Sequence, residues 1–391
     1  MISVTEALTR VFELVRPMAT ETVLLGDASG RVLQGEVTAR RDQPPFRASA
    51  MDGYALRGDL AHPGAQFKVV GEAAAGRGFA GALHGSGCVR IFTGAPVPKG
   101  ADRVVIQEDV TRDGEMITLG ARLGAELYVR PAGADFAAGT RIAGPKVLRA
   151  SDLALLASMN IAEVPVACRP VVALIATGDE LVMPGENPGP DQIIASNTFG
   201  LKAMIAAAGA VPRVLPIARD SEASLREVFG LAAGADLIVT IGGASVGDHD
   251  LVAQVATSLG MDRAFYKIAM RPGKPLMAGK LGDAAMIGLP GNPVSSMVCG
   301  HLFILPMIRA MLGLGQQPAP RRTARLACDL PGNGPREHYM RAQLTQDGIT
   351  PFQRQDSALL SVLADADALL VRPIGDGPRN AGDTVEYVPI S

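Results

Sequence analysis

Residues 170–178, PVVALIATG, form a continuous apolar run that ends in a turn, which is typical of a buried strand. Helix-like and strand-like segments then alternate along the chain, with helices at 196–209, 221–234 and 250–260 and strands at 210–220, 235–243, 263–270 and 284–293. Strands that alternate with helices of this length predict a doubly wound, mostly parallel α/β sheet with helices on both faces.

We place this α/β domain at 170–317, and the segments on either side of it differ from it in composition and in hydrophobic pattern. Residues 42–139 are rich in glycine with short apolar runs, which is typical of a small all-β domain. Residues 1–41 and 140–169 each combine a helix with a strand on either side of that insert, so we expect them to form one linking domain. After a proline-bearing linker, residues 318–391 hold short, closely spaced strands that predict a C-terminal β-barrel domain. The fold class is therefore multidomain α/β plus β.

Composition excludes some classes of protein. The chain has 391 residues, is 48% hydrophobic and carries 37 Lys and Arg against 39 Asp and Glu, for a net charge of −2. A chain of this length and hydrophobicity can bury large cores. The charge balance argues against a general nucleic-acid binder, which needs a dominant basic field. An anionic ligand must therefore be met by a local cluster of cations.

The N-terminal stretch MISVTEALTRVFELVRP mixes charged and apolar residues at helical spacing, so it predicts a helix over 3–18 and no signal peptide. No run approaches the ~20 apolar residues of a membrane span. The four cysteines, Cys88, Cys168, Cys299 and Cys328, form no Cys-x-x-Cys pair, so we expect no thiolate zinc or redox motif. These features predict a cytoplasmic protein without a membrane partner.

In open parallel sheets, ligands bind in the crevice outside the carboxyl ends of the strands. Here every strand is followed by a polar, glycine-rich or charged segment, namely 177–181, Asp220, 242–250, 271–275 and 290–293. That coincidence predicts one ligand site along this edge of the sheet. The loop GGASVG suits a phosphate or another oxyanion. An ordinary tight turn explains it equally well.

Charged residues of both signs accompany these loops. Lys267, Arg271 and Lys274 lie close together in the sequence. We favour an anion clamp over a solvated edge for them, because a nearly neutral protein meets an anion locally. Asp220 and Asp250 each precede a helix, and for Asp220 we favour helix capping. Several acids beside a cation cluster also indicate a divalent metal such as Mg²⁺ that bridges to phosphate oxygens.

The loop LPGNP places two prolines, a glycine and an asparagine between a strand and a helix. Pro290 and Pro293 fix the backbone and remove two donors. Gly291 permits close approach of a ligand, and Asn292 presents an amide. The loop is therefore preset, as the wall of a binding site should be. A rigid helix entry, with proline at the first helical position, is the alternative explanation.

Seven stretches occur in an order and with a spread that resemble the molybdopterin molybdenumtransferase (MoeA) family, whose animal relative is the C-terminal E-domain of gephyrin. They are SAMDGYA (49–55), IFTGAPVP (91–98), TGDEL (177–181), SN (196–197), GGASVGDHD (242–250), KIAMRPGKP (267–275) and LPGNPVS (289–295).

The resemblance implies an elongated homodimer of four-domain subunits, in which the linking domain also serves dimerisation. It implies that Asp52 and Thr93 are delivered by the other subunit to a cleft that holds Glu180, Asp220 and Asp250. Asp135 fits a further acidic position of the family. Where this chain has Arg271, the family often has lysine, and arginine keeps the charge while adding bidentate geometry.

The implied reaction transfers molybdenum from molybdate to the dithiolene of adenylylated molybdopterin, with Mg²⁺-dependent hydrolysis that releases AMP. Mg²⁺ would be held by Asp220 and Asp250, and Glu180 and Asp52 would orient ligands or transfer protons. Lys267, Arg271 and Lys274 would offset the negative charge of the pyrophosphate and of molybdate. The remaining binding positions would line the walls: Thr177, Gly242, Gly243, Ser245, Gly247, Pro290, Gly291, Asn292 and Pro293. A molybdopterin adenylyltransferase would donate the substrate.

Three other readings stay open at this stage. An adenylyltransferase of the same pterin would need only the parallel-sheet domain, and the β domain with Asp52 and Thr93 argues against it. A non-catalytic scaffold, the second role of the gephyrin domain, is opposed by the intact set of acids and cations. A paralogue that handles tungstate would have the same residues, because the two oxyanions are nearly equal in size and charge.

Overall fold

The computed structural model describes residues 1–243 and 251–390. Its internal contacts divide the chain into two compact units. The first holds Met1–Glu21 and Ala167–Ser391, and the second holds Thr22–Val166. The chain therefore starts in the first unit, passes through the second and returns.

The first unit contains a six-stranded sheet whose central strands are the apolar runs of the sequence. Its order is β18 (Val211–Val214), β15 (Val171–Ala176), β19 (Leu237–Ile241), β23 (Ala284–Leu289), β22 (Met277–Leu281) and β20 (Asp262–Tyr266). The first four strands are parallel, and β22 runs antiparallel to both of its neighbours. Every residue of β19 and β23 is buried, as expected of strands covered on both faces. The predicted mostly parallel sheet is confirmed, although the sequence pattern does not predict β22.

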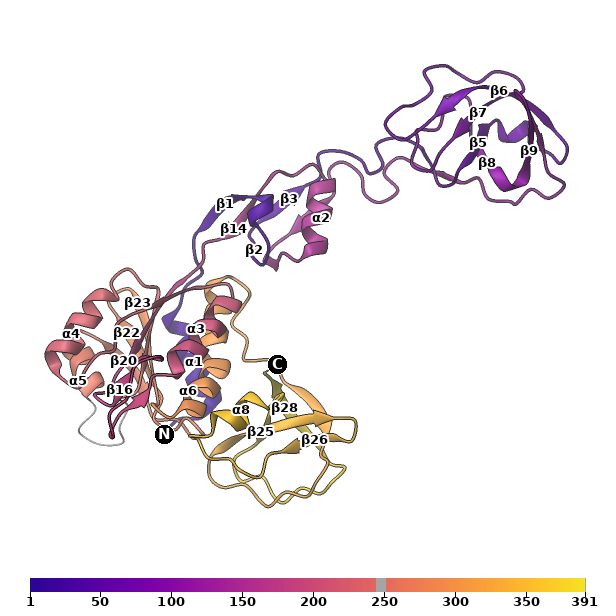
Figure 1. Cartoon of the computed structure of the whole chain (residues 1–391). Helices are drawn as coiled ribbons and strands as arrows, with labels where there is room; N and C mark the ends of the chain where they lie inside the picture. The colour runs from indigo at the N-terminus through magenta and orange to yellow at the C-terminus, as the bar shows by residue number, and fades with distance from the viewer. Residues whose placement is uncertain (244–250, 391) are drawn as a thin grey trace. The chain divides into compact units, whose positions relative to one another are not determined.

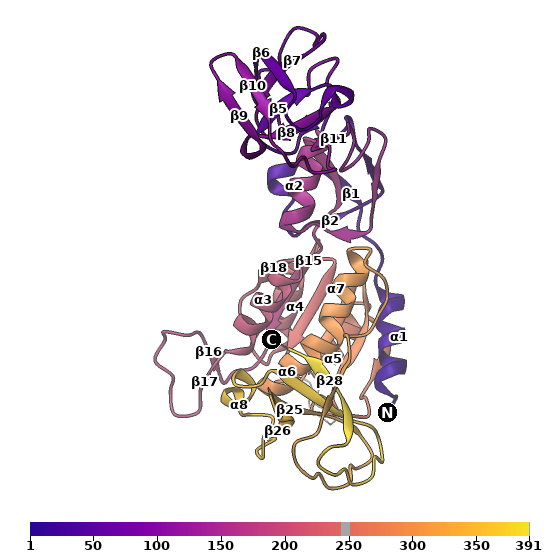
Figure 2. The same cartoon turned by 90° about the vertical axis from the view of Figure 1, so that its right-hand side faces the viewer.

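Helices cover both faces of this sheet, as predicted. Helix α3 (Asn197–Ala207) packs on β18 and β15, and α4 (Glu222–Leu231) packs beside α5 (Leu251–Ser258). Figure 1 shows α4 and α5 on one side of the strands and α3 on the other, and Figure 2 shows the α3 side. Leu225 of α4 and Val255 of α5 belong to one buried cluster with Ile238 and Met286 of the sheet. These contacts make the domain doubly wound.

The N-terminal helix α1 (Val4–Leu14) packs on β20 and β22 of the first unit. The hydroxyl of Ser3 caps it by accepting a hydrogen bond of 3.1 Å from the backbone N–H of Glu6. The prediction of a helix to residue 18 is wrong at the C-terminal end, because Val15 is already extended. The proline at position 17 explains this early end, since the residue before a proline avoids the helical region.

One helical stretch of 19 residues, Pro293–Met311, is long and apolar enough to cross a membrane by length and composition alone. It joins α6 (Pro293–Cys299), a π-helical turn (Gly300–Ile304) and α7 (Leu305–Met311). The expectation that no segment approaches such a span therefore needs correction. Within the described part of the chain, 78% of this window is buried inside the protein. Burial of that extent is what a core helix of the domain requires.

A second sheet in the first unit is built mainly by the C-terminal residues. Its order is β21 (Met270–Arg271), β25 (Glu337–Thr345), β27 (Ala368–Arg372), β28 (Thr384–Pro389) and β24 (Arg322–Arg325), with β26 (Gly348–Pro351) also paired to β25. Strand β21 belongs to the loop that follows β20 and runs parallel to β25. The loop RPGKP of the α/β domain is thus joined to the C-terminal sheet by backbone pairing.

The second unit holds two groups of strands. One sheet combines β1 (Thr20–Leu24), β14 (Glu163–Ala167), β2 (Val32–Leu33) and β13 (Lys146–Val147), and shares a buried cluster with helix α2 (Ala150–Ser158). The other sheet has the order β8 (Arg103–Ile106), β5 (Gly53–Leu56), β7 (Gly87–Ile91), β6 (Gln66–Ala73), β10 (Met116–Leu119) and β9 (Val110–Asp113). The second unit also contains two separate two-stranded sheets, which pair β4 (Ala48–Ser49) with β11 (Val129–Arg130) and β3 (Glu36–Thr38) with β12 (Arg141–Ala143).

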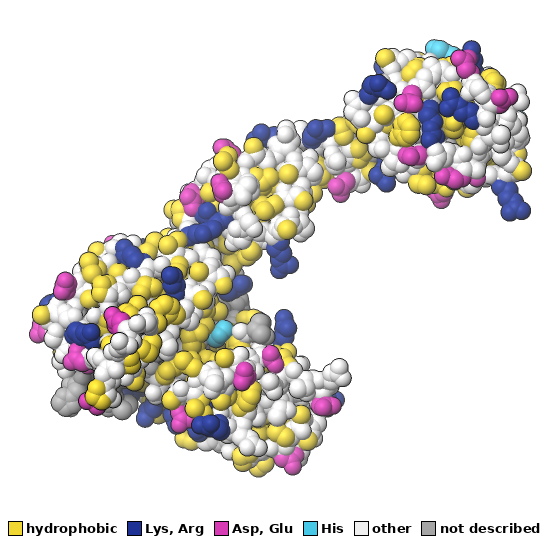
Figure 3. All heavy atoms as spheres, viewed as in Figure 1, with side chains coloured by type: hydrophobic (Ala, Val, Ile, Leu, Met, Phe, Trp, Pro, Cys, Tyr) yellow, Lys and Arg dark blue, Asp and Glu magenta, His cyan; other side chains and the backbone are white. Residues whose placement is uncertain are grey.

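On the face drawn in Figure 3, Lys and Arg side chains are interspersed with Asp and Glu side chains. This distribution agrees with the nearly balanced charge of the sequence. Recognition of an anion on this protein must therefore come from a local group of cations.

Candidate functional site

A cavity of about 490 Å³ opens at the carboxyl ends of β15, β19 and β23, and we call it the sheet-edge cavity. Its lining includes these residues predicted from the sequence: Thr177, Glu180, Gly242, Pro290, Gly291, Asn292 and Pro293. They come from three loops that the parallel register brings side by side, because the backbone N–H of Thr177 donates to Ile241 (2.9 Å) and that of Gly242 donates to Leu289 (3.1 Å). The structure thus unites most of the predicted walls.

The proline-rich wall of this cavity is fastened from behind. The side-chain amide of Asn197 donates a hydrogen bond of 2.8 Å to the carbonyl of Gly291. The hydroxyl of Ser296 donates to the carbonyl of Pro290. Pro293 is the first residue of α6, and the side chain of Asn292 makes no capping bond there. The same loop is therefore both the rigid entry to α6 and the wall of the cavity. The side-chain amide of Asn292 does not cap the helix.

Two glycines of the loop after β19 pack tightly against the end of β15. Gly242 has φ = +99°, and a Cβ atom there would lie 2.6 Å from the carbonyl oxygen of Thr177. Gly243 has φ = +66°, and a Cβ there would collide with the side chain of Val252. Gly291 differs, because its Cβ would meet only Gly242, at 3.5 Å, which is ordinary contact. Glycine is therefore required by the fold at positions 242 and 243 but not at 291.

A second cavity of about 340 Å³ adjoins the first, and we call it the cationic cavity. Both cavities are lined by Pro290 and Asn292. The α/β domain contributes Arg271 and Lys274, and the C-terminal domain contributes Arg336, Gln355, Asp356 and Ser357. The pairing of β21 with β25 and a hydrogen bond of 3.0 Å from the backbone N–H of Val294 to Ser357 hold the two sides together. Three cations thus converge on one small cavity.

Behind this cavity lies a fully buried arginine, Arg341. One guanidinium nitrogen donates to the carbonyl of Asp356 (3.0 Å), whereas Nε and Nη1 have no partner among the described residues. Burial lowers the pKa of Arg341. Burial, together with the charges of Arg271, Arg341, Arg336 and Arg372, also lowers the pKa of His338 to about 4, so this imidazole is neutral at pH 7. The cavity is lined by three cationic side chains and one carboxylate, that of Asp356, and this excess of positive charge favours an anion there.

Some predicted residues lie outside both cavities. Lys267 has φ = +68°, and its ammonium lies 4.7 Å above the ring of Tyr266. Asp220 is exposed, and its backbone N–H donates to the carboxylate of Asp179 (3.1 Å). The prediction that Asp220 caps the following helix is wrong, because the hydroxyl of Ser221 accepts the capping bond from Ser224. The predicted residues Ser245, Gly247 and Asp250 lie outside the described residues.

The sequence resemblance implies Asp220 and Asp250 as ligands of Mg²⁺. Within the described ranges, no group of three or more His, Cys, Asp or Glu side chains is arranged to hold a metal ion. Asp220 is described and Asp250 is not. Mg²⁺ is commonly held by one or two carboxylates together with substrate phosphates, rather than by a site built of protein ligands alone. An exposed aspartate at the sheet edge, such as Asp220, fits this common mode of binding.

Asp52 and Thr93, two residues singled out by the sequence resemblance, contact each other in the second unit. Strands β5 and β7 are paired, with Gly53 opposite Ile91, so the residues at their ends are neighbours. The backbone N–H and the hydroxyl of Thr93 both donate to one carboxylate oxygen of Asp52, at 2.7 and 2.8 Å. These two donors, the backbone one first, lower the pKa of Asp52. Asp135 is exposed on a separate turn of this unit.

We expect Thr93→Val to raise the pKa of Asp52, because valine keeps the backbone donor and removes the hydroxyl donor. The native pKa lies below the ordinary 3.8. Asp52 therefore stabilises the fold above that value and loses this contribution as the pH falls, and the variant has the smaller contribution. An NMR titration of labelled aspartate carboxyl carbons measures the shift. Thr111→Val, on the exposed strand β9 of the same sheet, is the matched control. An identical Asp52 titration in the Thr93 variant would contradict the assigned hydroxyl bond.

Several residues of the two cavities escape the sequence reasoning. Arg336, Gln355 and Ser357 lie in the C-terminal domain and are brought to the cavity by the pairing of β21 with β25 and by the backbone hydrogen bond from Val294 to Ser357. A charged residue within the apolar strand pattern HYMRAQL, Arg341, is the sequence signal that marks this strand as unusual.

Comparison with protein families identifies the class of each region. Residues 2–160 match the MoeA N-terminal region (domain I and II). Residues 173–310 match the probable molybdopterin binding domain. Residues 323–390 match the MoeA C-terminal region (domain IV). The sheet-edge cavity therefore lies in the domain of the molybdopterin-binding class.

Similar proteins align with nearly the full length of the chain. A molybdopterin molybdenumtransferase of Nostoc sp. is 35% identical, with 98% of this chain and 93% of that protein aligned. Molybdopterin molybdenumtransferase 2 of Mycobacterium tuberculosis is 34% identical, with 95% and 96% aligned. The crystal structure of a MoeA protein from Pyrococcus horikoshii OT3 matches all of both chains with a TM-score of 0.85 at 25% identity. The chain belongs to the molybdopterin molybdenumtransferase (MoeA) family.

Proposed function

We propose that this protein is a molybdopterin molybdenumtransferase of molybdenum cofactor biosynthesis. It transfers molybdenum from molybdate to the dithiolene of adenylylated molybdopterin and hydrolyses the phosphoanhydride, so that AMP leaves. In the transfer, the two thiols of the dithiolene lose their protons as two Mo–S bonds form, and an oxo group that takes up these two protons leaves molybdenum as water. The site must therefore relay protons from the thiols to the departing oxo group.

One observation carries this proposal: two cavities of different character share the residues Pro290 and Asn292. The sheet-edge cavity has walls of glycine, proline and amide groups and suits a flat heterocycle with its phosphates. The cationic cavity is small and lined by three cations, which suits a compact dianion such as molybdate. Their common wall would bring the dithiolene end of the pterin next to the oxyanion.

The residues that line the two cavities would then have separate roles. Arg271, Lys274 and Arg336 offset the charge of molybdate, and Arg271 offers two parallel donors where a lysine would offer one point charge. Glu180 lines the sheet-edge cavity and is exposed to its solvent, so it can exchange protons with a departing oxo group. Thr177, Gly242 and Asn292 shape the wall around the pterin and its phosphates.

We propose Asp220 and Asp250 as the ligands of a Mg²⁺ cofactor. Bound between these acids and the substrate, it would neutralise the charge of the phosphoanhydride. The exposure of Asp220 beside the sheet edge supports this assignment.

The function is tested with purified full-length protein, adenylylated molybdopterin, molybdate and Mg²⁺. The proposal predicts release of AMP together with incorporation of molybdenum into the pterin, measured by chromatography and elemental analysis. An adenylyltransferase would instead form adenylylated product from molybdopterin and ATP, and that outcome would overturn the proposal. Replacing molybdate by tungstate in the same assay compares the two oxyanions.

We expect Asp220→Asn to raise the Mg²⁺ concentration needed for half-maximal AMP release by about tenfold, because an amide is a weaker ligand than a carboxylate for a hard cation. The measurement is AMP release against Mg²⁺ concentration. Asp283→Asn is the matched control, since Asp283 is also exposed but lies in the turn before β23, at the opposite edge of the sheet. Equal Mg²⁺ dependence of both variants would show that Asp220 is not a metal ligand.

We further propose that the active form is a cytoplasmic homodimer in which Asp52 and Thr93 of one copy complete the site of the other, with Asp135 as an additional acid. The support is the order of the matching motifs and the joined Asp52–Thr93 pair, which leaves one carboxylate oxygen for substrate. The remaining predicted cation, Lys267, would act near the same edge. A molybdopterin adenylyltransferase would hand over the adenylylated pterin.

A further inference from the structure

Arg336 lines the cationic cavity, and its guanidinium makes no hydrogen bond or ion pair with another described residue. Arg336 is the last residue before β25 and follows an irregular loop, residues 331–335. A long side chain on a loose loop would pay a high entropic cost to bind an anion. The backbone at Arg336 must therefore be held by other groups.

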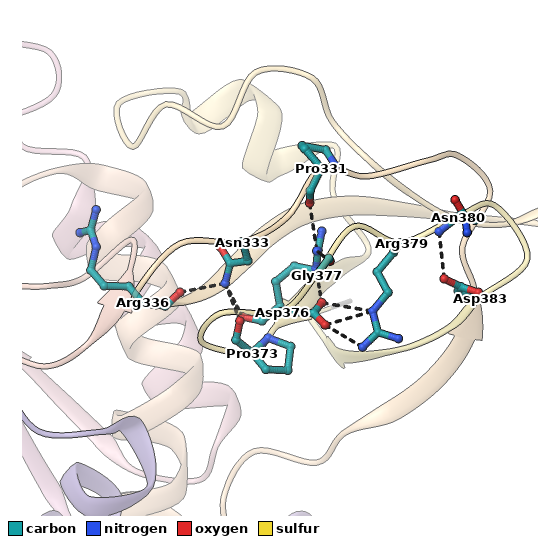
Figure 4. A network of polar contacts seen from close by, with 10 residues as sticks. Pro331, Asn333, Arg336, Pro373, Asp376, Gly377, Arg379, Asn380 and Asp383 are labelled. Atoms are coloured by element: carbon teal, nitrogen blue, oxygen red, sulfur yellow. Dashed lines mark hydrogen bonds and ion pairs between the residues drawn. The ribbon is translucent and has the colours of Figure 1, made fainter.

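Asn333 holds this backbone. Its side-chain amide nitrogen lies within hydrogen-bonding distance of three carbonyl oxygens, those of Arg336 (2.9 Å), Arg372 (3.0 Å) and Pro373 (2.6 Å). Its backbone N–H donates to the carbonyl of Asp376 at 2.7 Å. Figure 4 shows Asn333 between the two segments, with the Arg336 side chain extending away from the network. One side chain thus ties the Arg336 loop to the turn after β27.

That turn is itself anchored by a buried ion pair. Arg372 is 3% exposed, and it donates to the carboxylate of Asp376 (2.6 Å) and to the carbonyls of Pro331 (3.0 Å) and Gly377 (2.7 Å). Arg379 donates to the other oxygen of Asp376 at 2.7 Å. Hydrogen bonds from Arg379 and Arg372 lower the pKa of Asp376, so its carboxylate stays charged. A buried pair that is satisfied in this way forms a stiff support.

We propose that Asn333 is a positioning residue for the cationic cavity: it fixes the loop that presents Arg336 and so sets the affinity for the oxyanion. This inference rests on the proposed function, because it takes molybdate as the ligand of that cavity. Asn333 does not touch the ligand, and it acts through Arg336. Its loss should therefore weaken binding of molybdate and leave the rate of the bound complex nearly unchanged.

A purely structural role for Asn333 predicts a different pattern. Stability would then fall, whereas the effect of Asn333→Ala on the affinity for molybdate would not depend on whether Arg336 is present. A double-mutant cycle between positions 333 and 336 separates the two roles, because residues that act through one another give non-additive effects.

The experiment measures molybdate binding to the full-length protein by equilibrium dialysis, and KM and kcat in the AMP-release assay. We expect Asn333→Ala to weaken molybdate binding about tenfold and raise its KM equally, with kcat within about twofold. In the Arg336→Ala background, the same change should add less than about twofold. Asp329→Ala is the matched control: it removes a hydrogen bond of 2.8 Å that the backbone N–H of Ala381 donates in the same domain, and among the described residues the Asp329 side chain makes no hydrogen bond to Asn333 or Arg336, so molybdate binding should stay unchanged.

Two outcomes contradict the proposals separately. Unchanged molybdate affinity in Asn333→Ala, with reduced affinity in Arg336→Ala, overturns the positioning role and keeps the function of the cavity. Unchanged affinity in Arg336→Ala overturns the assignment of the cavity itself. Should Asn333→Ala fail to fold, Asn333→Ser retains one donor, and the same cycle with a smaller shift decides between the roles.

Discussion

Gly242→Ala should destabilise the first unit by about 3 kcal/mol and abolish the shape of the sheet-edge cavity. Two costs add. Residue 242 has φ = +99°, which L-residues adopt only with strain, and the new methyl group would lie 2.6 Å from the carbonyl oxygen of Thr177. That oxygen belongs to the backbone at the end of a buried strand, so the collision cannot be relieved by rotating a side chain. Thermal unfolding followed by circular dichroism measures the loss.

Gly291→Ala is the matched control in the neighbouring loop of the same cavity. A Cβ at position 291 would approach Gly242 at 3.5 Å, and its φ is not positive, so the fold should tolerate alanine within about 1 kcal/mol. Equal melting temperatures for Gly242→Ala and wild type would show that the loop after β19 is not held as described. Equal destabilisation of both variants would show the same.

Heterodimers of Asp52→Asn and Glu180→Gln chains should regain about half of the wild-type activity, whereas each variant alone should lose at least about a hundredfold. Asp52 lies in the second unit and Glu180 in the first. If each site takes its first unit from one copy and its second unit from the other, the heterodimer contains one intact site out of two. Co-expression with two affinity tags isolates the heterodimer, and AMP release measures its activity.

The opposite arrangement gives a clear alternative result. If each copy completes its own site, both sites of the heterodimer carry one defect and activity stays at the level of the single variants. The doubly substituted chain Asp52→Asn/Glu180→Gln, paired with wild type, gives the reciprocal test. If the sites are shared between copies, each site of this heterodimer carries one defect and activity stays low, whereas copies that complete their own sites leave one site intact and give about half activity.

The α/β sheet could be predicted from the sequence because its central strands carry the full signal in their own residues. Strand β19, LIVTI, is apolar at every position and entirely buried. Strand β22, MAGKL, contains glycine and lysine and lies near the edge of the sheet, so its local pattern resembles a loop. The helix predicted over 3–18 ends at Leu14, since the local effect of a proline outweighs the apolar spacing.

The candidate site likewise contains residues that could be predicted from local sequence patterns and residues that could not. The wall residues Thr177, Gly242 and Asn292 follow predictable strands, so their convergence follows from the rule for parallel sheets. The cationic cavity depends on β21, a strand of two residues whose partner β25 begins at Glu337. No local pattern encodes a pairing over that distance, and Arg336 and Ser357 could not be assigned before the structure.

We propose that molybdate binds between Arg271, Lys274 and Arg336, beside the cavity proposed for the pterin. Anomalous scattering at the molybdenum absorption edge, from crystals of the full-length protein soaked with molybdate, tests it most directly. We predict a molybdenum peak in the cationic cavity, within contact of these three side chains. A molybdenum peak elsewhere on the protein, with no peak in that cavity, would contradict the account.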